Sequence, residues 1–110
     1  HGAMLAQMNR RGQIGGCVVD GPLALDNAVS REAAAHKGIV SEVAGDADII
    51  LVPDIESGNM LYKALNFLGG ALSAGVILGA RAPIVLTSRA DSEASKLHSI
   101  ALAAAIGGKP

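Results

Sequence analysis

A serine, an arginine and an aspartate stand close together near the end of this sequence. Ser88 and Arg89 lie between a predicted strand and a predicted helix, and Asp91 follows them. An arginine side chain can hold phosphate through two parallel hydrogen bonds, and the helix expected to begin near Ser92 adds free backbone donors. We therefore treat Ser88, Arg89 and Asp91 as candidate catalytic residues. The alternatives are that Ser88 is an ordinary strand-exit residue and Arg89 a solvated surface charge.

A second polar group surrounds the start of an earlier predicted helix. It consists of Glu56, Asn59, Tyr62 and Lys63. Lys63 can neutralise a phosphate group as a point charge. The structural alternatives are that Glu56 and Asn59 cap the helix and that Tyr62 only packs. We treat these four residues as candidate ligand-binding residues.

These candidates sit on strand-like and helix-like segments that alternate along the chain. Short β-favouring apolar runs predict strands, and apolar residues at helical spacing predict the helices between them. The expected strands are 17–20, 49–52, 75–79 and 83–87. The expected helices run from Met4 to Gly12, from Leu25 to Gly38, from Ser57 or Gly58 to Gly69, and from Asp91 or Ser92 to Gly107.

The alternation indicates an α/β fold. Strands separated by helices favour crossover connections, which predicts a three-layer sandwich with a mostly parallel sheet. Only residues 80–82 separate the last two strands, so part of the sheet is expected to be antiparallel or to belong to another layer. We expect 1–79 to form part of one α/β domain, and 80–110 to supply a strand, the Ser88–Arg89 loop and the C-terminal helix. Ligands in such sheets collect at the carboxyl ends of strands, where these polar loops lie.

Composition narrows the classes of function. The 110 residues carry nine basic and ten acidic side chains, a net charge of −1, which gives no general field for nucleic acid or an anionic membrane. The lone Cys17, expected to be a small buried hydrophobe, cannot form an internal disulfide, and a cytoplasmic location follows as the default. Asp20 and Asp26 lack the spacing of a metal cage, so no metal site is expected.

The apolar residues are mostly small. Half of the chain is apolar, yet it holds one Phe, one Tyr and no Trp, beside 14 glycines. Because small side chains bury little area, such a core stabilises a fold weakly against the entropy of ordering the chain. We expect this chain to depend on further protein or on a partner subunit.

Four segments, in the same order, resemble the phosphate acetyl/butyryltransferase family. They are Val19–Ala28, Ala44–Ile49, Asp54–Lys63 and Leu86–Ser92, and the similarity runs from about Arg11 to the C-terminus. The segments look more like the butyryl branch than the acetyl branch. Members of the family are far longer, so the resemblance implies that this chain is a C-terminal portion.

The resemblance implies a two-domain enzyme with the isocitrate/isopropylmalate-dehydrogenase-like fold, usually a homodimer, with its site between the domains. Residues 1–79 would belong to the family's second domain, and 80–110 would pack on its first. The implied reaction exchanges an acyl group between coenzyme A and inorganic phosphate by direct thiolate attack on an acyl phosphate. Coenzyme A is a substrate in this reaction, and no metal or permanently bound cofactor is required.

The resemblance also implies roles for individual residues. The family's counterpart of Ser88 is assigned to polarising the acyl phosphate, and that of Arg89 to binding the phosphoryl group. The segment that includes Asn59, Tyr62 and Lys63 matches a helix start beside the cleft. These three residues and Glu56 are therefore expected to bind the substrate or coenzyme A.

One position departs from the family pattern. The acetyl branch has an aspartate that is proposed as the base for the coenzyme thiol, but this chain has Ser95 there, which cannot act as a base. A free thiol titrates at about 8.5, so a base or a positive environment must help to form the thiolate. Asp91 and Glu93 are the nearest carboxylates, and the identity of the base stays open.

Two other classes of function remain as alternatives. The chain could be a non-catalytic dimerisation or coenzyme A-binding module. An isocitrate-type oxidoreductase rests only on fold analogy, and it would require a carboxylate cluster for a divalent metal that the sequence does not display.

Overall fold

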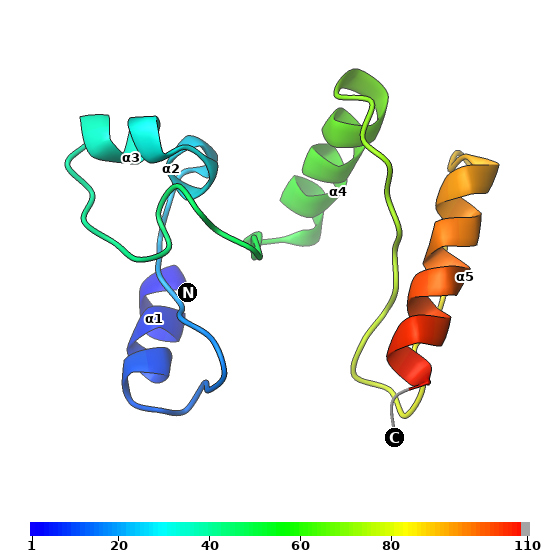
Figure 1. Cartoon of the computed structure of the whole chain (residues 1–110), viewed down its shortest axis with the longest axis horizontal. Coiled ribbons are helices and arrows are strands. Elements are labelled where there is room, and N and C mark those ends of the chain that lie inside the picture. The colour runs from blue at the N-terminus through cyan, green and yellow to red at the C-terminus, as the bar shows by residue number, and fades with distance from the viewer. Residues whose placement is uncertain (109–110) are drawn as a thin grey trace. The chain divides into compact units, whose positions relative to one another are not determined.

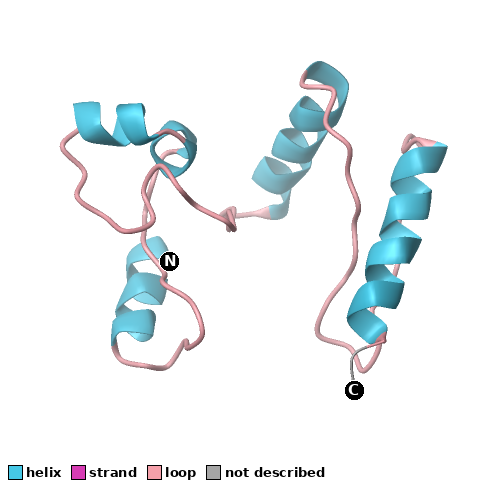
Figure 2. Cartoon of the chain, in the orientation of Figure 1, coloured by secondary structure: helices cyan, strands magenta, loops and turns pink. Residues whose placement is uncertain are grey.

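The computed structural model describes residues 1–108, so 109–110, which were included with the C-terminal segment, lie outside the described residues. The chain divides into two units, His1–Ile55 and the residues from Glu56 onward. The described residues form five α-helices and one π-helical turn, joined by extended loops (Figures 1 and 2). No helix in this part of the chain is long and apolar enough to cross a membrane.

The first unit contains three helices, α1 (Gly2–Arg10), α2 (Leu25–Val29) and α3 (Arg31–His36). The first predicted helix is confirmed, whereas the single helix expected from Leu25 to Gly38 is wrong, since it is broken at Ser30. Ser30 has an extended backbone, and its hydroxyl accepts a hydrogen bond from the N–H of Ala33 at 3.2 Å. A serine in this conformation caps the helix that follows it, which explains why one helix becomes two.

Asn9 holds the segment that was expected to form the first strand. Its side-chain amide donates to the carbonyl oxygens of Ile14 and Cys17, both at 2.9 Å, and accepts from the N–H of Val19 at 3.1 Å. Residues 17–20 are therefore a loop attached to α1. Cys17 is exposed, so its predicted burial is wrong.

The other predicted strands are extended segments without a sheet. Ile77 and Ile84 form an isolated antiparallel bridge, which agrees with the first of the two expectations for these segments, an antiparallel pair or a place in another layer. Residues 49–52 form no strand, and Ile49 and Leu51 are exposed, at 85% and 76%. A strand needs a neighbour that takes up its backbone donors and acceptors, and the described residues supply none for 49–52. The three-layer α/β sandwich and the boundary after residue 79 therefore stay predictions.

The helix α4 (Ile55–Lys63) starts at the last residue of the first unit and otherwise lies in the second, where it continues directly into the π-helical turn η1 (Ala64–Leu68). The start of α4 precedes the predicted start at Ser57 or Gly58. The predicted stop at Gly69–Gly70 is confirmed. The N–H of Gly69 bonds to the carbonyl oxygen of Ala64 at 3.0 Å, and Gly70 has a φ of 64°, which favours glycine.

The last helix is α5 (Glu93–Gly107), and its cap confirms the predicted start. The Ser92 hydroxyl accepts from the N–H of Ser95 at 3.1 Å. Inside the helix, Ser99 is only 2% exposed. Its hydroxyl donates to the carbonyl oxygen of Ser95 at 2.7 Å and accepts from the N–H of Gly75 at 2.9 Å, which joins α5 to the extended segment before it.

The apolar core is small. The buried apolar side chains of the described residues are Ala6, Ala28 and Ala34. Large apolar side chains are exposed instead, among them Val40 at 100% and Leu68 at 88%. Alanine buries little area, so these side chains contribute little hydrophobic stabilisation. Side-chain hydrogen bonds such as those of Asn9 and Ser99 therefore fix much of the local structure. This pattern agrees with the expected dependence on further protein, which remains a prediction.

A methyl group at Gly69 is expected to disturb the end of η1. A Cβ atom there would lie 2.8 Å from the carbonyl oxygen of Leu65, whereas a Cβ atom at Gly75 would meet nothing within 4 Å. Gly69→Ala should therefore lower the free energy of unfolding by about 1–3 kcal/mol, the usual cost of overpacking. Gly75→Ala, which keeps its N–H, is the matched control in urea unfolding followed by circular dichroism. Equal stability of the two variants would contradict this account.

Candidate functional site

Ser88, Arg89 and Asp91 lie in one closed turn directly before α5. The N–H of Asp91 donates to the carbonyl oxygen of Ser88 at 3.1 Å, and the N–H of Ser88 donates to Oδ2 of Asp91 at 2.7 Å. The Ser88 hydroxyl oxygen accepts from the N–H of Ala90 at 3.3 Å. Aspartate and serine close turns through such local bonds. The turn leaves the side chains of Ser88 and Arg89 exposed.

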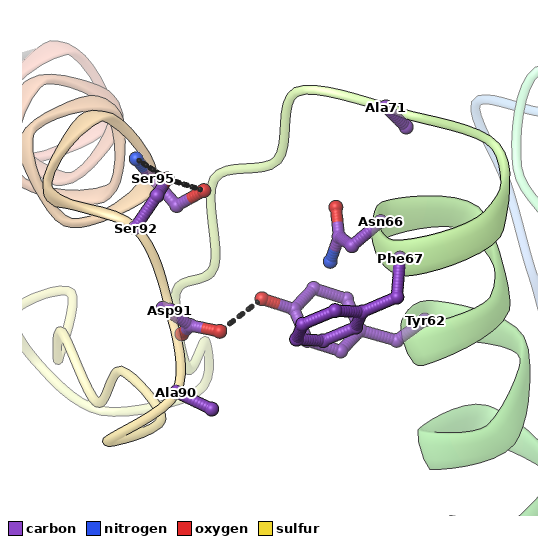
Figure 3. A pocket seen from close by; sticks show the side chains of 8 residues that line it. All are labelled: Tyr62, Asn66, Phe67, Ala71, Ala90, Asp91, Ser92 and Ser95. Atoms are coloured by element: carbon purple, nitrogen blue, oxygen red, sulfur yellow. Dashed lines mark hydrogen bonds between the residues drawn. The ribbon is translucent and has the colours of Figure 1, made fainter.

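Tyr62 connects this turn to α4. Its hydroxyl donates to Oδ1 of Asp91 at 2.7 Å, as Figure 3 shows. The same hydroxyl lies 3.4 Å from Oγ of Ser73, and Ser73 donates to Oγ of Ser95 at 3.3 Å. The network thus joins α4, the extended segment and the first turn of α5. Tyr62 was predicted to contact ligand, which stays a prediction; in this structure its hydroxyl is bonded to Asp91.

Sequence reasoning did not select Ser73 or Ser99 as site residues. A signal was present for part of the network. Ser92, Ser95 and Ser99 follow one another at helical spacing and form a hydroxyl stripe on an otherwise apolar helix. Such a stripe indicates a helix face that contacts polar groups, here the hydroxyl of Ser73 and the N–H of Gly75.

A cavity of about 130 Å³ lies beside the Tyr62–Asp91 contact. The π-helical turn changes which side chains reach this cavity, because its backbone hydrogen bonds join residues five positions apart, whereas those of an α-helix join residues four positions apart. The side chain of Phe67 therefore lines the same cavity as Tyr62, and Figure 3 draws both rings among the lining side chains. The lining residues are Tyr62, Asn66, Phe67, Ala71, Ala90, Asp91, Ser92 and Ser95.

The other three candidates on α4 line a separate open groove of about 550 Å³. Its residues are Glu56, Asn59, Met60, Lys63, Ala64, Phe67 and Leu68. The Lys63 ammonium lies 5.9 Å from the centre of the Phe67 ring, close enough for a cation–π contact. The structure therefore separates the four predicted ligand-binding residues, since Tyr62 lines the cavity whereas Glu56, Asn59 and Lys63 line the groove.

The charge state of Asp91 follows from these contacts. The Tyr62 hydroxyl, first, and the N–H of Ser88, second, lower the pKa of the Asp91 carboxyl below its usual value, although partial desolvation opposes them. The positive charges of Lys63 and Lys96 lower this pKa further. Asp91 is therefore ionised at neutral pH and acts as a hydrogen-bond acceptor.

Asp20 and Asp26, which were considered as metal ligands, have structural partners instead. Asp26 pairs with the Lys37 ammonium at 2.9 Å, and Oδ1 of Asp20 accepts from the N–H of Gly21 at 2.8 Å. A hydrogen bond from Ser41 is the largest cause of the lowered pKa of Asp20. Within residues 1–108, no three His, Cys, Asp or Glu side chains gather in a way that could hold a metal ion.

Comparison with known proteins identifies relatives of nearly the whole chain. Residues 2–104 match the family model described as "Phosphate acetyl/butaryl transferase". A phosphate acetyltransferase of Thermotoga maritima is 66% identical over 93% of this chain and 35% of its own length. A probable phosphate butyryltransferase of Bacillus subtilis is 67% identical over 92% of this chain and 34% of its own length.

A solved structure is also similar. It is a branched-chain phosphotransacylase from Enterococcus faecalis, 46% identical, with a TM-score of 0.74 over 91% of this chain and 37% of that one. The chain thus spans about a third of the length of the relatives that it matches. Relatives named for acetyl and for butyryl transfer are nearly equally similar, at 66% and 67%.

The lowered pKa of Asp91 can be measured by NMR. Because the folded pKa lies below the unfolded one, the stability that the ionised carboxylate contributes is complete above the unfolded pKa and is lost as the pH falls through the folded pKa. The side-chain carboxyl carbon of Asp91 should titrate at a lower pH in the folded chain than in the chain unfolded by urea. The control Tyr62→Phe lacks the hydroxyl that contributes most to the lowered pKa of Asp91, so in this variant the pKa of Asp91 should return toward its usual value. Equal or raised values in the folded chain would contradict the described contacts.

Proposed function

This chain belongs to the phosphate acetyl/butyryltransferase family, and on that premise we propose that it is part of an acyltransferase. The proposed reaction is acyl-CoA plus phosphate giving acyl phosphate plus coenzyme A, with butyryl or another short chain as the acyl group. The observation that carries this proposal is the match of residues 2–104 to the family, together with 66–67% identity to relatives named for this activity.

We also propose that this chain holds only part of the active site. The chain spans about a third of its relatives' length, and its large apolar side chains, such as Val40 and Ile49, are exposed. We propose that the remainder of a longer protein completes the three-layer α/β fold and supplies the opposite wall of the cleft. A cytoplasmic homodimer is part of the same proposal, on the family resemblance.

The Ser88–Arg89 turn has chemistry that suits an acyl phosphate. The Ser88 hydroxyl oxygen accepts from Ala90, which leaves its proton free to be donated to the acyl carbonyl oxygen. The exposed Arg89 guanidinium forms no ion pair with other described residues, so it is available to hold the phosphoryl group by two parallel bonds. In the reverse direction, which consumes the acyl phosphate, the coenzyme A thiolate attacks the carbonyl carbon, and the carbon–oxygen bond to phosphate breaks. Phosphate leaves with the electron pair, and both donors face oxygens on which negative charge develops.

The groove on α4 suits a ligand with both a phosphate and an apolar part. Lys63 provides a positive charge beside the apolar side chains of Met60 and Phe67. Asn59 and Glu56 add a side-chain amide and a carboxylate, which can bond to amide or hydroxyl groups. Coenzyme A carries phosphate, apolar, amide and hydroxyl groups, which complement these side chains. We therefore propose that this groove contributes to coenzyme A binding.

A non-catalytic dimerisation or coenzyme A-binding module is the second candidate function. It is favoured for the isolated chain because this chain covers only about a third of the length of its relatives. Sedimentation and calorimetry with coenzyme A separate these possibilities. A stable dimer that binds no coenzyme A would favour a purely structural module, whereas coenzyme A binding without turnover would favour a fragment of the enzyme.

Arg89→Ala in the intact protein should lower kcat/KM for acyl phosphate by about 10²–10³-fold, because a preorganised charge on the developing phosphate is lost. Arg81→Ala removes another exposed arginine of the same unit and is the matched control, expected to stay near the wild-type rate. Thioester formation from acyl phosphate and coenzyme A is the measurement. A near wild-type rate in Arg89→Ala would remove this arginine from the mechanism, and an inactive wild type would overturn the proposed function.

The acyl preference forms a separate prediction. If the site belongs to the butyryl branch, kcat/KM should be higher with butyryl phosphate than with acetyl phosphate by roughly tenfold or more, since each additional buried methylene contributes to the discrimination. The two donors are compared in the same assay at equal concentrations of coenzyme A. A preference for acetyl phosphate would assign the protein to the acetyl branch.

A further inference from the structure

Asp91 connects two parts of the site that lie far apart in the sequence. Its Oδ1 atom accepts from the Tyr62 hydroxyl and its Oδ2 atom accepts from the N–H of Ser88, both at 2.7 Å. We propose that Asp91 is a positioning residue that fastens the Ser88–Arg89 turn to α4 through Tyr62, and that it is not the base for the coenzyme thiol. This inference rests on the proposed acyltransferase function.

The hydrogen bonds of Asp91 disfavour a role as base. A general base must take up a proton, and each oxygen of Asp91 already accepts a short hydrogen bond that is strongest to the ionised form. An ordinary aspartate already titrates about 4.6 pH units below a cysteine-type thiol. The Tyr62 hydroxyl, the N–H of Ser88 and the nearby Lys63 and Lys96 lower the pKa of Asp91 further. Proton transfer from a thiol to Asp91 is therefore strongly unfavourable.

The turn needs an anchor of this kind. Ser88, Arg89 and Ala90 are all exposed, so the turn has little packing of its own. On its C-terminal side the chain is held by the Ser92 cap of α5. The Tyr62–Asp91 bond supplies a second attachment, to a different helix, and fixes the direction in which Ser88 and Arg89 project. Misplacement of a reacting group by about 1 Å can cost about 10²-fold in rate, so such a contact can matter without touching the substrate.

Tyr62 and Lys63 are sequence neighbours with different tasks in this arrangement. Tyr62 faces the cavity and holds Asp91, whereas Lys63 lines the groove. Loss of the tether should therefore leave the groove unchanged. The expected signature is a lower kcat with a KM for coenzyme A that stays within about twofold of the wild-type value, because the groove residues are untouched.

The test compares Tyr62→Phe, Asp91→Asn and the double variant in the intact protein. A positioning role predicts that each single change lowers kcat by about tenfold and that the double variant is no worse, since Tyr62→Phe removes the Tyr62–Asp91 bond and Asp91→Asn, whose amide keeps one acceptor oxygen, weakens the same bond. The shape of the pH–rate profile should stay the same in all three. A catalytic base would behave differently. Asp91→Asn would then lower kcat by about 10²–10⁴-fold and change the profile, whereas Tyr62→Phe, which keeps the carboxylate, would have a far smaller effect. That pattern would overturn the proposal.

A control and a second readout separate failure of this proposal from failure of the proposed function. Glu42→Gln removes an exposed carboxylate from the first unit and should leave kcat unchanged. In the intact protein, amide hydrogen exchange at Ser88 should become about tenfold faster in Tyr62→Phe than in the wild type, because the turn loses its attachment. Unchanged exchange at Ser88 would overturn the positioning role. An inactive wild type would overturn the acyltransferase function, and the exchange result would still decide the role of Asp91.

Discussion

The hydrogen bond from Tyr62 to Asp91 is the contact on which the candidate site depends. It joins residues 29 positions apart and attaches an exposed turn to a helix. Through it, Ser88 and Arg89 acquire a defined place although neither is packed. The short distance of 2.7 Å and the ionised acceptor make this a strong hydrogen bond. The other hydroxyl contacts of the unit, from Ser73 through Ser95 to Ser92, extend the same polar network toward α5.

Polar contacts have this importance because the apolar core is slight. Among the residues that the structure describes, the buried apolar side chains are three alanines of the first unit, which contribute little transfer free energy. In the second unit, the 2%-exposed Ser99 bridges α5 and the extended segment, where a large apolar side chain would stand in a well-filled core. Removal of the Ser99 hydroxyl would leave the N–H of Gly75 without its acceptor, which lowers the free energy of unfolding by about 1–3 kcal/mol.

Features that depend on neighbouring residues were predictable from the sequence. The Ser92 cap and the stop at Gly69–Gly70 follow from local chemistry, and both are confirmed. The break at Ser30 was missed because the apolar stripe continues through it. The π-helical turn has no sequence signal that separates five-residue from four-residue bonding. The Tyr62–Asp91 bond could not be predicted, because it depends on how α4 and the turn before α5 come together. A sheet depends in the same way on distant partners, so strand-like segments such as 49–52 do not reveal which strands would pair with them.

A crystal structure of the intact protein with inorganic phosphate and coenzyme A would test the central claim most directly, namely that the turn held by Asp91 forms the phosphoryl side of the site. The account predicts phosphate bound to the Arg89 guanidinium and the Ser88 hydroxyl, with Asp91 still accepting from Tyr62 and from the N–H of Ser88. Phosphate bound away from this turn, or an Asp91 carboxylate that has left Tyr62 to face the coenzyme sulfur, would contradict it.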